Sequence, residues 1–143
     1  MPKHEQIMVA LFAALQTAVG VTVGRNVALP EVGSDSTTCT LKDGPIQPGD
    51  EFINPPVYEF TMTPTVLIIV SGGANEAARD AAIASVLDSL LATIAAITDL
   101  GGLTLAIRPQ PPTTAPKELW GAADMKGAEF GIEIDYESDS SAG

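Results

Sequence analysis

Histidine and cysteine are the scarcest reactive residues in this chain, since His4 and Cys39 are the only ones. A zinc site of cysteines and histidines needs more ligands than these two residues supply. A Ser-His-Asp triad usually places its serine in G-x-S-x-G, which does not occur. One cysteine cannot form an intramolecular disulfide, so we interpret Cys39 as a small buried apolar group in a reducing compartment, with a reactive thiol as the alternative. We therefore expect no metal, no cofactor and no enzymatic activity.

Positive charge is also scarce. The chain has 7 Lys and Arg residues against 18 Asp and Glu residues, which gives a formal charge of −11, and the cations are scattered along the sequence. A nucleic-acid-binding surface needs clustered Lys and Arg to neutralise phosphates, so this composition argues against one. The same charge suits a protein past which DNA must move without sticking.

No apolar run approaches the roughly 18 residues that span a bilayer, and Asp88 interrupts the longest candidate. The N-terminal apolar run, Ile7 to Leu15, has a passing likeness to a secretory signal. Glu5 lies in its would-be positive region, however, and the apolar residues repeat at helical spacing, which predicts an amphipathic helix over about residues 2–19.

The strongest signal that is present is a helix from Asn75 to Ile97. Its apolar residues fall on one stripe at helical spacing: Ile83, Val86, Leu87, Leu90, Leu91, Ile94 and Ile97. Asn75 can cap its N-terminus and Gly101-Gly102 can end it. The helix also holds many alanines, which raise helix propensity and keep it thin, so we expect a flat apolar sheet to lie close against it.

Strand signals lie on both sides of this helix. They are short pieces at Val21–Val23 and Val27–Leu29, then Thr37–Leu41, Val57–Thr63, Val66–Val70, Leu103–Arg108 and about Ala123–Glu137. Pro64 is expected to mark a bulge or an edge where a strand changes partners. Of two proline-rich segments, Gly44–Pro56 is expected to be an irregular surface excursion. Pro109–Pro116 is expected to be a stiff, extended connection. The order predicts an α+β fold: a mostly antiparallel sheet with two main helices packed on one face and long irregular loops.

Three features are candidates for sites. Ser71-Gly72-Gly73 could cradle a phosphate or simply turn a strand into a helix, and no glycine-rich phosphate motif or lysine follows it. Trp120 is either a lid on the domain's own core or an anchor in a subunit contact. The last strand alternates apolar residues with Glu129, Glu133 and Asp135, so that these acids share a face, which is either a solvated surface or a functional acidic lining.

Two segments near the C-terminus carry a resemblance to a known family. Leu119-Trp120-Gly121-Ala122-Ala123-Asp124-Met125, followed by a strand ending Ile132-Glu133-Ile134-Asp135-Tyr136-Glu137, resembles the tail terminator (minor tail protein U-like) proteins of long-tailed bacteriophages. The order of elements along nearly the whole chain is similar too, whereas the two proline-rich segments depart from the family pattern.

The resemblance implies a single tail-terminator-like domain over residues 1–143, with a polar tail at 138–143. It implies a homohexameric ring that caps the head-proximal end of the tail tube, stops tube polymerisation and joins the tail to the head connector. DNA passes through the lumen without specific binding.

The partners it implies are further copies of the chain, the major tail tube protein and a head-tail connector or head-closure protein. It places the protein in the virion and not in a membrane, with assembly in the host cytoplasm. Leu119 and Trp120 are the candidate interface, and Glu129, Glu133 and Asp135 the candidate acidic lumen face. Another neck, head-closure or tail-completion ring protein is the alternative, followed by a small carboxylate-dependent enzyme.

Overall fold

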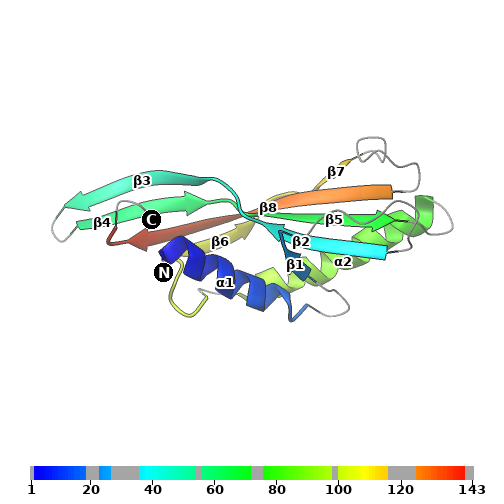
Figure 1. Cartoon of the computed structure of the whole chain (residues 1–143), viewed down its shortest axis with the longest axis horizontal. Helices are drawn as coiled ribbons and strands as arrows, with labels where there is room; N and C mark the ends of the chain where they lie inside the picture. Colours follow the sequence, from blue (N-terminus) through cyan, green and yellow to red (C-terminus); the bar gives the residue numbers. More distant parts are fainter. Residues whose placement is uncertain are drawn as a thin grey trace.

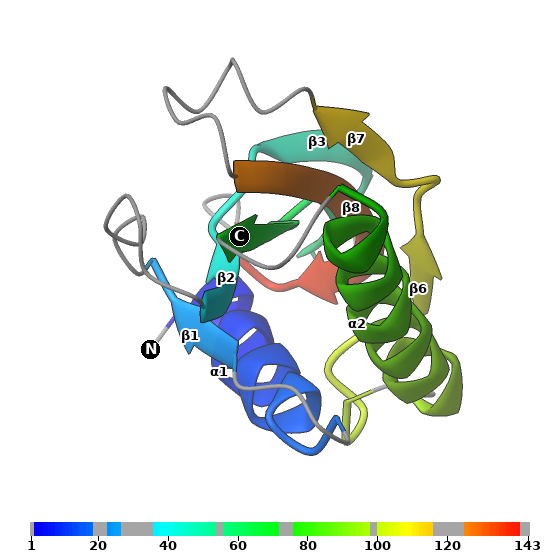
Figure 2. The same cartoon turned by 90° about the vertical axis from the view of Figure 1, so that its right-hand side faces the viewer.

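The computed structural model describes residues 2–18, 23–26, 36–53, 56–71, 76–97, 100–115 and 125–140. Within these ranges two helices, α1 (Lys3–Leu15) and α2 (Glu76–Ala96), lie on one face of an eight-stranded sheet (Figures 1 and 2). The described strands pair in antiparallel fashion except for β1 with β2. The predicted α+β fold, with both helices on one face, is confirmed.

Strand β8 is the axis of this sheet. The strands are β1 (Val23–Arg25), β2 (Ser36–Lys42), β3 (Ile46–Ile53), β4 (Pro56–Met62), β5 (Thr65–Ser71), β6 (Ala106–Pro109), β7 (Thr113–Ala115) and β8 (Met125–Ser138). One edge of β8 pairs with β5 and then β4, and its other edge pairs with β7 and then β6. Outside these, β2 pairs with β5, β1 with β2, and β3 with β4.

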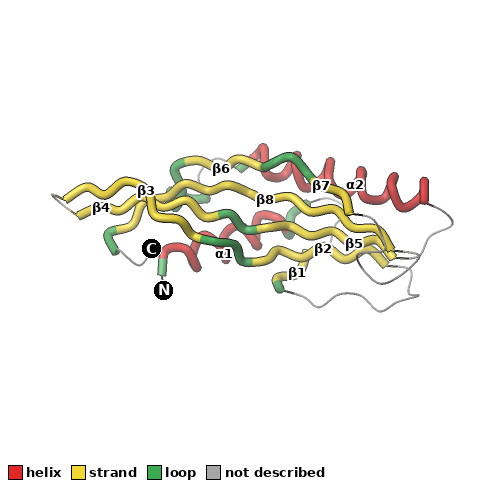
Figure 3. The backbone as a smooth tube through the Cα atoms, turned by 90° about the horizontal axis from the view of Figure 1, so that it is seen from above, coloured by secondary structure: helices red, strands yellow, loops and turns green. Residues whose placement is uncertain are grey.

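The sheet therefore consists of two half-sheets joined through β8. We call β1, β2, β5, β7 and residues 125–130 of β8 the body, and β3, β4, β6 and residues 132–138 of β8 the arm. The strands on either side of β8 are interrupted along one line, which we call the seam. It consists of residues 43–45, between β2 and β3, 63–64, between β4 and β5, and 110–112, between β6 and β7, together with Gly131 of β8. Figure 3 shows these breaks in green near the middle of the long strands. Pro64 lies where β4, paired with β3, gives way to β5, paired with β2, as predicted.

The core lies between the helices and the sheet. The predicted stripe of α2 faces it, with Ile83, Val86, Leu90 and Ile94 buried and Leu87, Leu91 and Ile97 partly buried. Helix α1 contributes Ile7, Met8, Leu11 and Leu15. It ends at Leu15, earlier than expected, because the chain turns at residues 16–17. The expected end at Val19 and the expected cap Asn75 lie outside the described residues.

The sheet that was expected to lie against α2 does so, although the alanines of this helix do not face it. Seven of them are exposed and Ala82 is half-buried; the exposed ones are Ala77, Ala78, Ala81, Ala84, Ala92, Ala95 and Ala96. The branched apolar residues fill the space over the sheet because they bury more surface, so the alanines occupy the solvent side. There they favour the helix through propensity alone.

The proline-rich segments are more regular than predicted. Most of Gly44–Pro56 is strand β3, which pairs with β4 and has a bulge between Pro48 and Glu51. Within Pro109–Pro116, residues 113–115 form β7 and pair with β8. Proline and glycine are tolerated in β3 because this strand pairs on one side only among the described residues, so a missing N–H or a bulge disrupts few ladder bonds.

The remaining strand boundaries shift slightly. Strand β2 extends the predicted Thr37–Leu41 by one residue at each end, and β8 begins at Met125 and ends at Ser138. Strand β6 starts later than predicted, at Ala106, and β1 includes the Gly24-Arg25 pair that was predicted to interrupt it. The piece expected at 27–29 lies outside the described residues.

Strand β5 is buried on both faces, as its continuous apolar run predicts. Val66, Ile68 and Val70 belong to the core beneath the helices. Leu67 and Ile69 point to the other face and are each 1 % exposed. Cys39, opposite Ile68 on β2, is also buried, as predicted, and burial raises the pKa of its thiol to about 12. This thiol therefore stays protonated and unreactive near neutral pH.

Candidate functional site

The three predicted acids share one face of β8, on the side of the sheet opposite the helices, which we call the outer face. Glu129 is exposed, while Glu133 and Asp135 are half-buried. Their neighbours in sequence are the buried residues Phe130, Ile132, Ile134 and Tyr136 on the helix side. The predicted alternation is confirmed because successive side chains of a strand point to opposite faces.

Arg108 of β6 binds two of these acids. It lies directly opposite Glu133, and its Nη2 donates to Glu133 Oε1 and to Asp135 Oδ2, the latter at 2.9 Å. Thr61 of β4 donates its hydroxyl to Asp135 Oδ1 at 2.8 Å. Burial would raise the pKa of Asp135, but the bonds from Arg108 and Thr61 lower it below its ordinary value. The pKa of Arg108 is raised by its hydrogen bonds to Glu133 and Asp135.

Carboxylates still outnumber cations on this part of the outer face. Glu59 of β4 lies directly opposite Glu137 of β8. Like charges on directly opposed residues repel and cost stability. Counted over the described side chains of β4, β6 and β8, this face has five carboxylates, on Glu59, Glu129, Glu133, Asp135 and Glu137, and one guanidinium, on Arg108. The face therefore remains negative although Arg108 offsets part of its charge.

A hollow of about 320 Å³ lies beside the Thr61–Asp135 pair. Its lining is formed by Gly49, Glu59, Phe60, Thr61, Leu105, Asp135 and Tyr136. A carboxylate enzyme would need a general acid of raised pKa in such a place, whereas the pKa of Asp135 is lowered. Asp135 therefore does not suit the role of a general acid in this hollow.

The other predicted sites are largely outside the described residues. Leu119 and Trp120 lie there, as do Gly72 and Gly73 of the possible phosphate turn. In the ranges that the structure does describe, no three His, Cys, Asp or Glu side chains gather to hold a metal. No helix in those ranges is long and apolar enough to cross a membrane.

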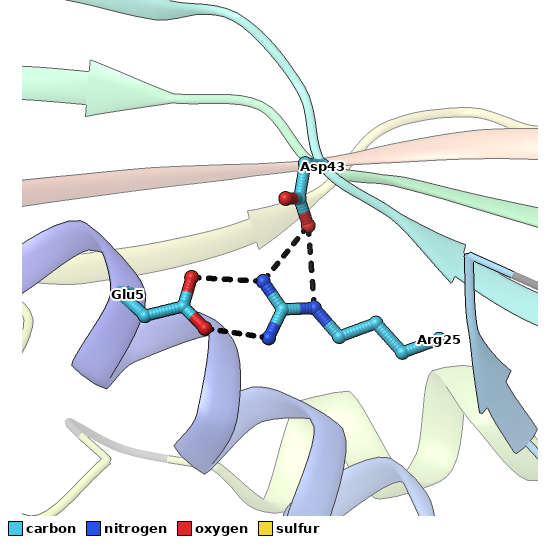
Figure 4. A network of polar contacts seen from close by, with 3 residues as sticks. All are labelled: Glu5, Arg25 and Asp43. Carbon is cyan, nitrogen blue, oxygen red and sulfur yellow. Dashed lines mark hydrogen bonds and ion pairs between the residues drawn. The ribbon is translucent and has the colours of Figure 1, made fainter.

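A second charged network was not predicted from the sequence. Arg25 of β1 donates to both carboxylate oxygens of Glu5 on α1, at 2.8 and 2.9 Å, and to Asp43 Oδ1 from Nη2 at 3.0 Å and from Nε at 3.3 Å (Figure 4). The hydrogen bonds from Arg25 lower the pKa of Glu5, and those to Glu5 and Asp43 raise the pKa of Arg25. These residues are far apart in sequence, so spacing gives no signal of their contact.

Comparison with known proteins gives similarity in structure only. No protein-family model and no curated protein matches the chain. One similar solved structure belongs to the virion of a native gene transfer agent particle, with 18% identity, 95% of this chain and 92% of that chain covered, and a TM-score of 0.48.

Another similar structure is the sheath/tube terminator of an extracellular contractile injection system (PVC) in its extended state. The identity is 11%, 95% of this chain is covered and the TM-score is 0.47. The matched part is 57% of that protein's length, so this chain spans little more than half of it. At these identities and TM-scores neither similarity assigns a function.

Proposed function

We propose that this protein is a structural subunit of a phage-like tail: a tail terminator that assembles as a homohexameric ring on the head-proximal end of the tail tube. In this role it stops polymerisation of the tube protein and presents a surface to the head connector, while DNA passes through the ring. The proposal starts from the resemblance of residues 119–125 and 132–137 to tail terminators.

The observation that carries the proposal is the exposure of β3. This strand forms one end of the sheet and is exposed along its whole length. Near its end Phe52 is 50 % exposed and Ile53 is 80 % exposed. An edge strand with exposed apolar side chains is a surface that a neighbouring subunit commonly buries. Pro48 and the bulge after it interrupt the strand midway, which limits indiscriminate pairing and favours one specific neighbour.

We further propose that the acidic outer face lines or approaches the lumen through which DNA passes. Glu129, Glu133 and Asp135 would then repel the phosphates of passing DNA. Arg108 reduces this charge without reversing it and holds β6 against β8. A wall that repels DNA weakly lets it slide, whereas a basic wall would bind it.

The first test is the mass of the purified protein by sedimentation or light scattering, alone and with its cognate tail tube protein. We expect a ring of about six subunits, alone or when tubes are present, and tubes that stop at a fixed length in electron micrographs. A monomer that ignores tubes and binds only the head connector would overturn the terminator role in favour of another neck ring.

Charge reversal tests the lumen face. Glu129→Lys with Glu137→Lys leaves the Arg108 bridges intact and should slow DNA ejection from assembled particles or retain DNA. Asp80→Lys with Asp88→Lys makes the same change of charge on exposed positions of α2 and serves as the control. The triple variant of Glu129, Glu133 and Asp135 to Lys should have the larger effect. Unchanged ejection in both outer-face variants would count against a lumen position.

The candidate interface residue Trp120 is the only tryptophan of the chain, so its fluorescence reports on one site. If Trp120 anchors a subunit contact, its emission should shift to shorter wavelength when rings form, because the indole leaves water. If it is instead a lid on its own subunit, the spectrum stays the same on assembly. Leu119→Ala should weaken ring formation only in the first case.

A further inference from the structure

Backbone hydrogen bonds of ordinary length run along the seam from one strand break to the next. Thr63 N donates to Pro45 O at 3.0 Å, Ile132 N donates to Pro64 O at 2.9 Å, and Gln110 N donates to Gly131 O at 2.8 Å. Three neighbouring strand breaks are therefore linked edge to edge. The prolines among them have no N–H, so these positions can accept a ladder bond but cannot donate one.

Two glycines lie where this line is tightest. A Cβ on Gly44 would lie 1.7 Å from Thr63 O, and one on Gly131 would lie 2.2 Å from Gln110 Oε1. A side chain cannot fit at Gly44 without moving the neighbouring backbone, whereas at Gly131 the flexible side chain of Gln110 would have to move. The seam is thus built from residues that allow strands to approach, bend and change direction, which is the composition of a hinge.

The arm has its own internal connections beyond the seam. Phe60 and Tyr136 stack with ring centroids 5.4 Å apart, and Arg108 and Thr61 join β6, β8 and β4 through Asp135. The helices contact mainly β5, β8, β6 and β1. Figure 1 shows the β3–β4 hairpin extending past the N-terminal end of α1. The arm is thus connected within itself, and its inner side chains, Phe60 and Tyr136 among them, pack in the core that the helices cover.

One side chain connects the seam to the helical layer. The guanidinium of Arg25 lies between Glu5, in the first turns of α1, and Asp43, the first residue of the seam (Figure 4). The side chain of Arg25 is only 21 % exposed. A bidentate, partly buried pair of this kind is stronger and more directional than an ordinary surface ion pair.

We propose that the seam is a hinge about which the arm tilts relative to the body, and that Arg25 is the latch that holds the arm in the observed position. With the latch closed, Asp43 is fixed to α1 and the arm is held at one angle. With the latch open, the hinge residues absorb the rotation and both half-sheets keep their ladders. This proposal does not depend on the proposed tail function.

Hydrogen exchange read by mass spectrometry tests the latch. In Arg25→Gln we expect exchange of β3 and β4 amides to rise about tenfold, while β5 amides keep their wild-type protection. Lys42→Gln is the matched control, because it removes one positive charge from the residue next to Asp43 on an exposed side chain. Equal loss of protection in arm and body would show a general effect on stability and overturn the proposal, as would unchanged exchange in the arm.

A distance measurement tests the hinge itself. Spin labels on Phe52→Cys and Ala92→Cys, in a Cys39→Ala background, report the distance between the arm and an exposed position of α2. We expect one narrow distance distribution in the labelled protein that keeps Arg25 and in its Lys42→Gln variant. In the Arg25→Gln variant the distribution should be broader or shifted. If Arg25→Gln folds poorly, Asp43→Asn removes only the seam side of the latch. An unchanged distribution in a folded latch variant would refute the hinge.

Discussion

Strands β5 and β3 belong to one sheet and are of similar length, yet they are held in opposite ways. Strand β5 is a run of Val, Leu and Ile that is buried on both faces. Strand β3 contains proline, glycine and acids and is exposed throughout. The body is therefore stabilised by burial of its own side chains, whereas the edge of the arm depends on its ladder with β4. A buried strand such as β5 can be predicted from its composition, whereas an exposed edge strand such as β3 cannot.

The largest expected difference between the two regions is in the cost of removing an apolar side chain. Ile68→Ala in β5, where Ile68 is 0 % exposed, should lower the free energy of unfolding by about 2–5 kcal/mol. Ile53→Ala in β3 should change it by no more than about 0.5 kcal/mol. Urea denaturation of both variants measures the contrast. Similar losses in the two would mean that the arm is buried in solution.

The stability cost of a glycine-to-alanine substitution should depend on whether the glycine lies in the seam. Gly44→Ala should cost about 1–3 kcal/mol, because the new Cβ meets Thr63 O. Gly49→Ala is the control within the arm: its Cβ would lie 3.5 Å from Glu59 O, an ordinary contact, and should be neutral or stabilising by about 0.4–1 kcal/mol. If Gly44→Ala melts at the same temperature as the wild type, the seam is looser than described.

The arm's ion pairs should give it a dependence on acid. The bonds from Arg108 and Thr61 lower the pKa of Asp135 in the folded chain, so its pairing stabilises the fold above the ordinary carboxyl pKa. This stability is lost as the pH falls below that pKa and through the lower pKa of the folded state. The Asp135→Asn variant should therefore lose less stability than the wild type as the pH falls. At neutral pH the substitution should lower the free energy of unfolding by about 1 kcal/mol or less.

Urea titrations at a series of pH values measure this slope. Glu129→Gln, an exposed position on the same face of β8 that Arg108 does not bridge, should keep the wild-type slope. An identical acid slope in wild type and Asp135→Asn would show that the Arg108 bridge does not form in solution.

Substitution of the exposed apolar residues at the end of β3 should have the smallest effect on folding but a large effect on assembly. Phe52→Ser with Ile53→Ser should change the free energy of unfolding by about 0.5 kcal/mol or less, because both side chains are already exposed. If the arm edge contacts a neighbouring subunit, this variant should form fewer rings in sedimentation than the exposed control Val9→Ser on α1. Equal ring formation in both would remove β3 from the interface.

The sequence was sufficient wherever burial dictates the pattern. The α2 stripe, the alternation of β8, the fully buried β5 and the change of partners at Pro64 were all predicted, because each follows from periodicity or from the missing N–H of proline. These features fix the fold class and the face on which the acids lie.

The sequence was insufficient wherever a tertiary contact overrides local preference. Strand β3 was missed because its prolines and glycines are unfavourable in isolation and are tolerated only through pairing with β4. The partners of Arg25 and Arg108 depend on which strands lie side by side, which no local pattern reveals. Whether Leu119 and Trp120 form an interface stays a prediction.

The central position of β8 has a consequence for how the molecule is made. Both half-sheets are joined through this strand, and β4, β5, β6 and β7 all pair with it. It also follows all of its partner strands in the chain, so until it emerges from the ribosome β5 and β4 are each missing one of their two pairing neighbours. Helix formation and the local hairpins can precede it, but the long-range ladders cannot. We therefore expect the nascent chain to stay open until residues 125–138 are released and then to close cooperatively.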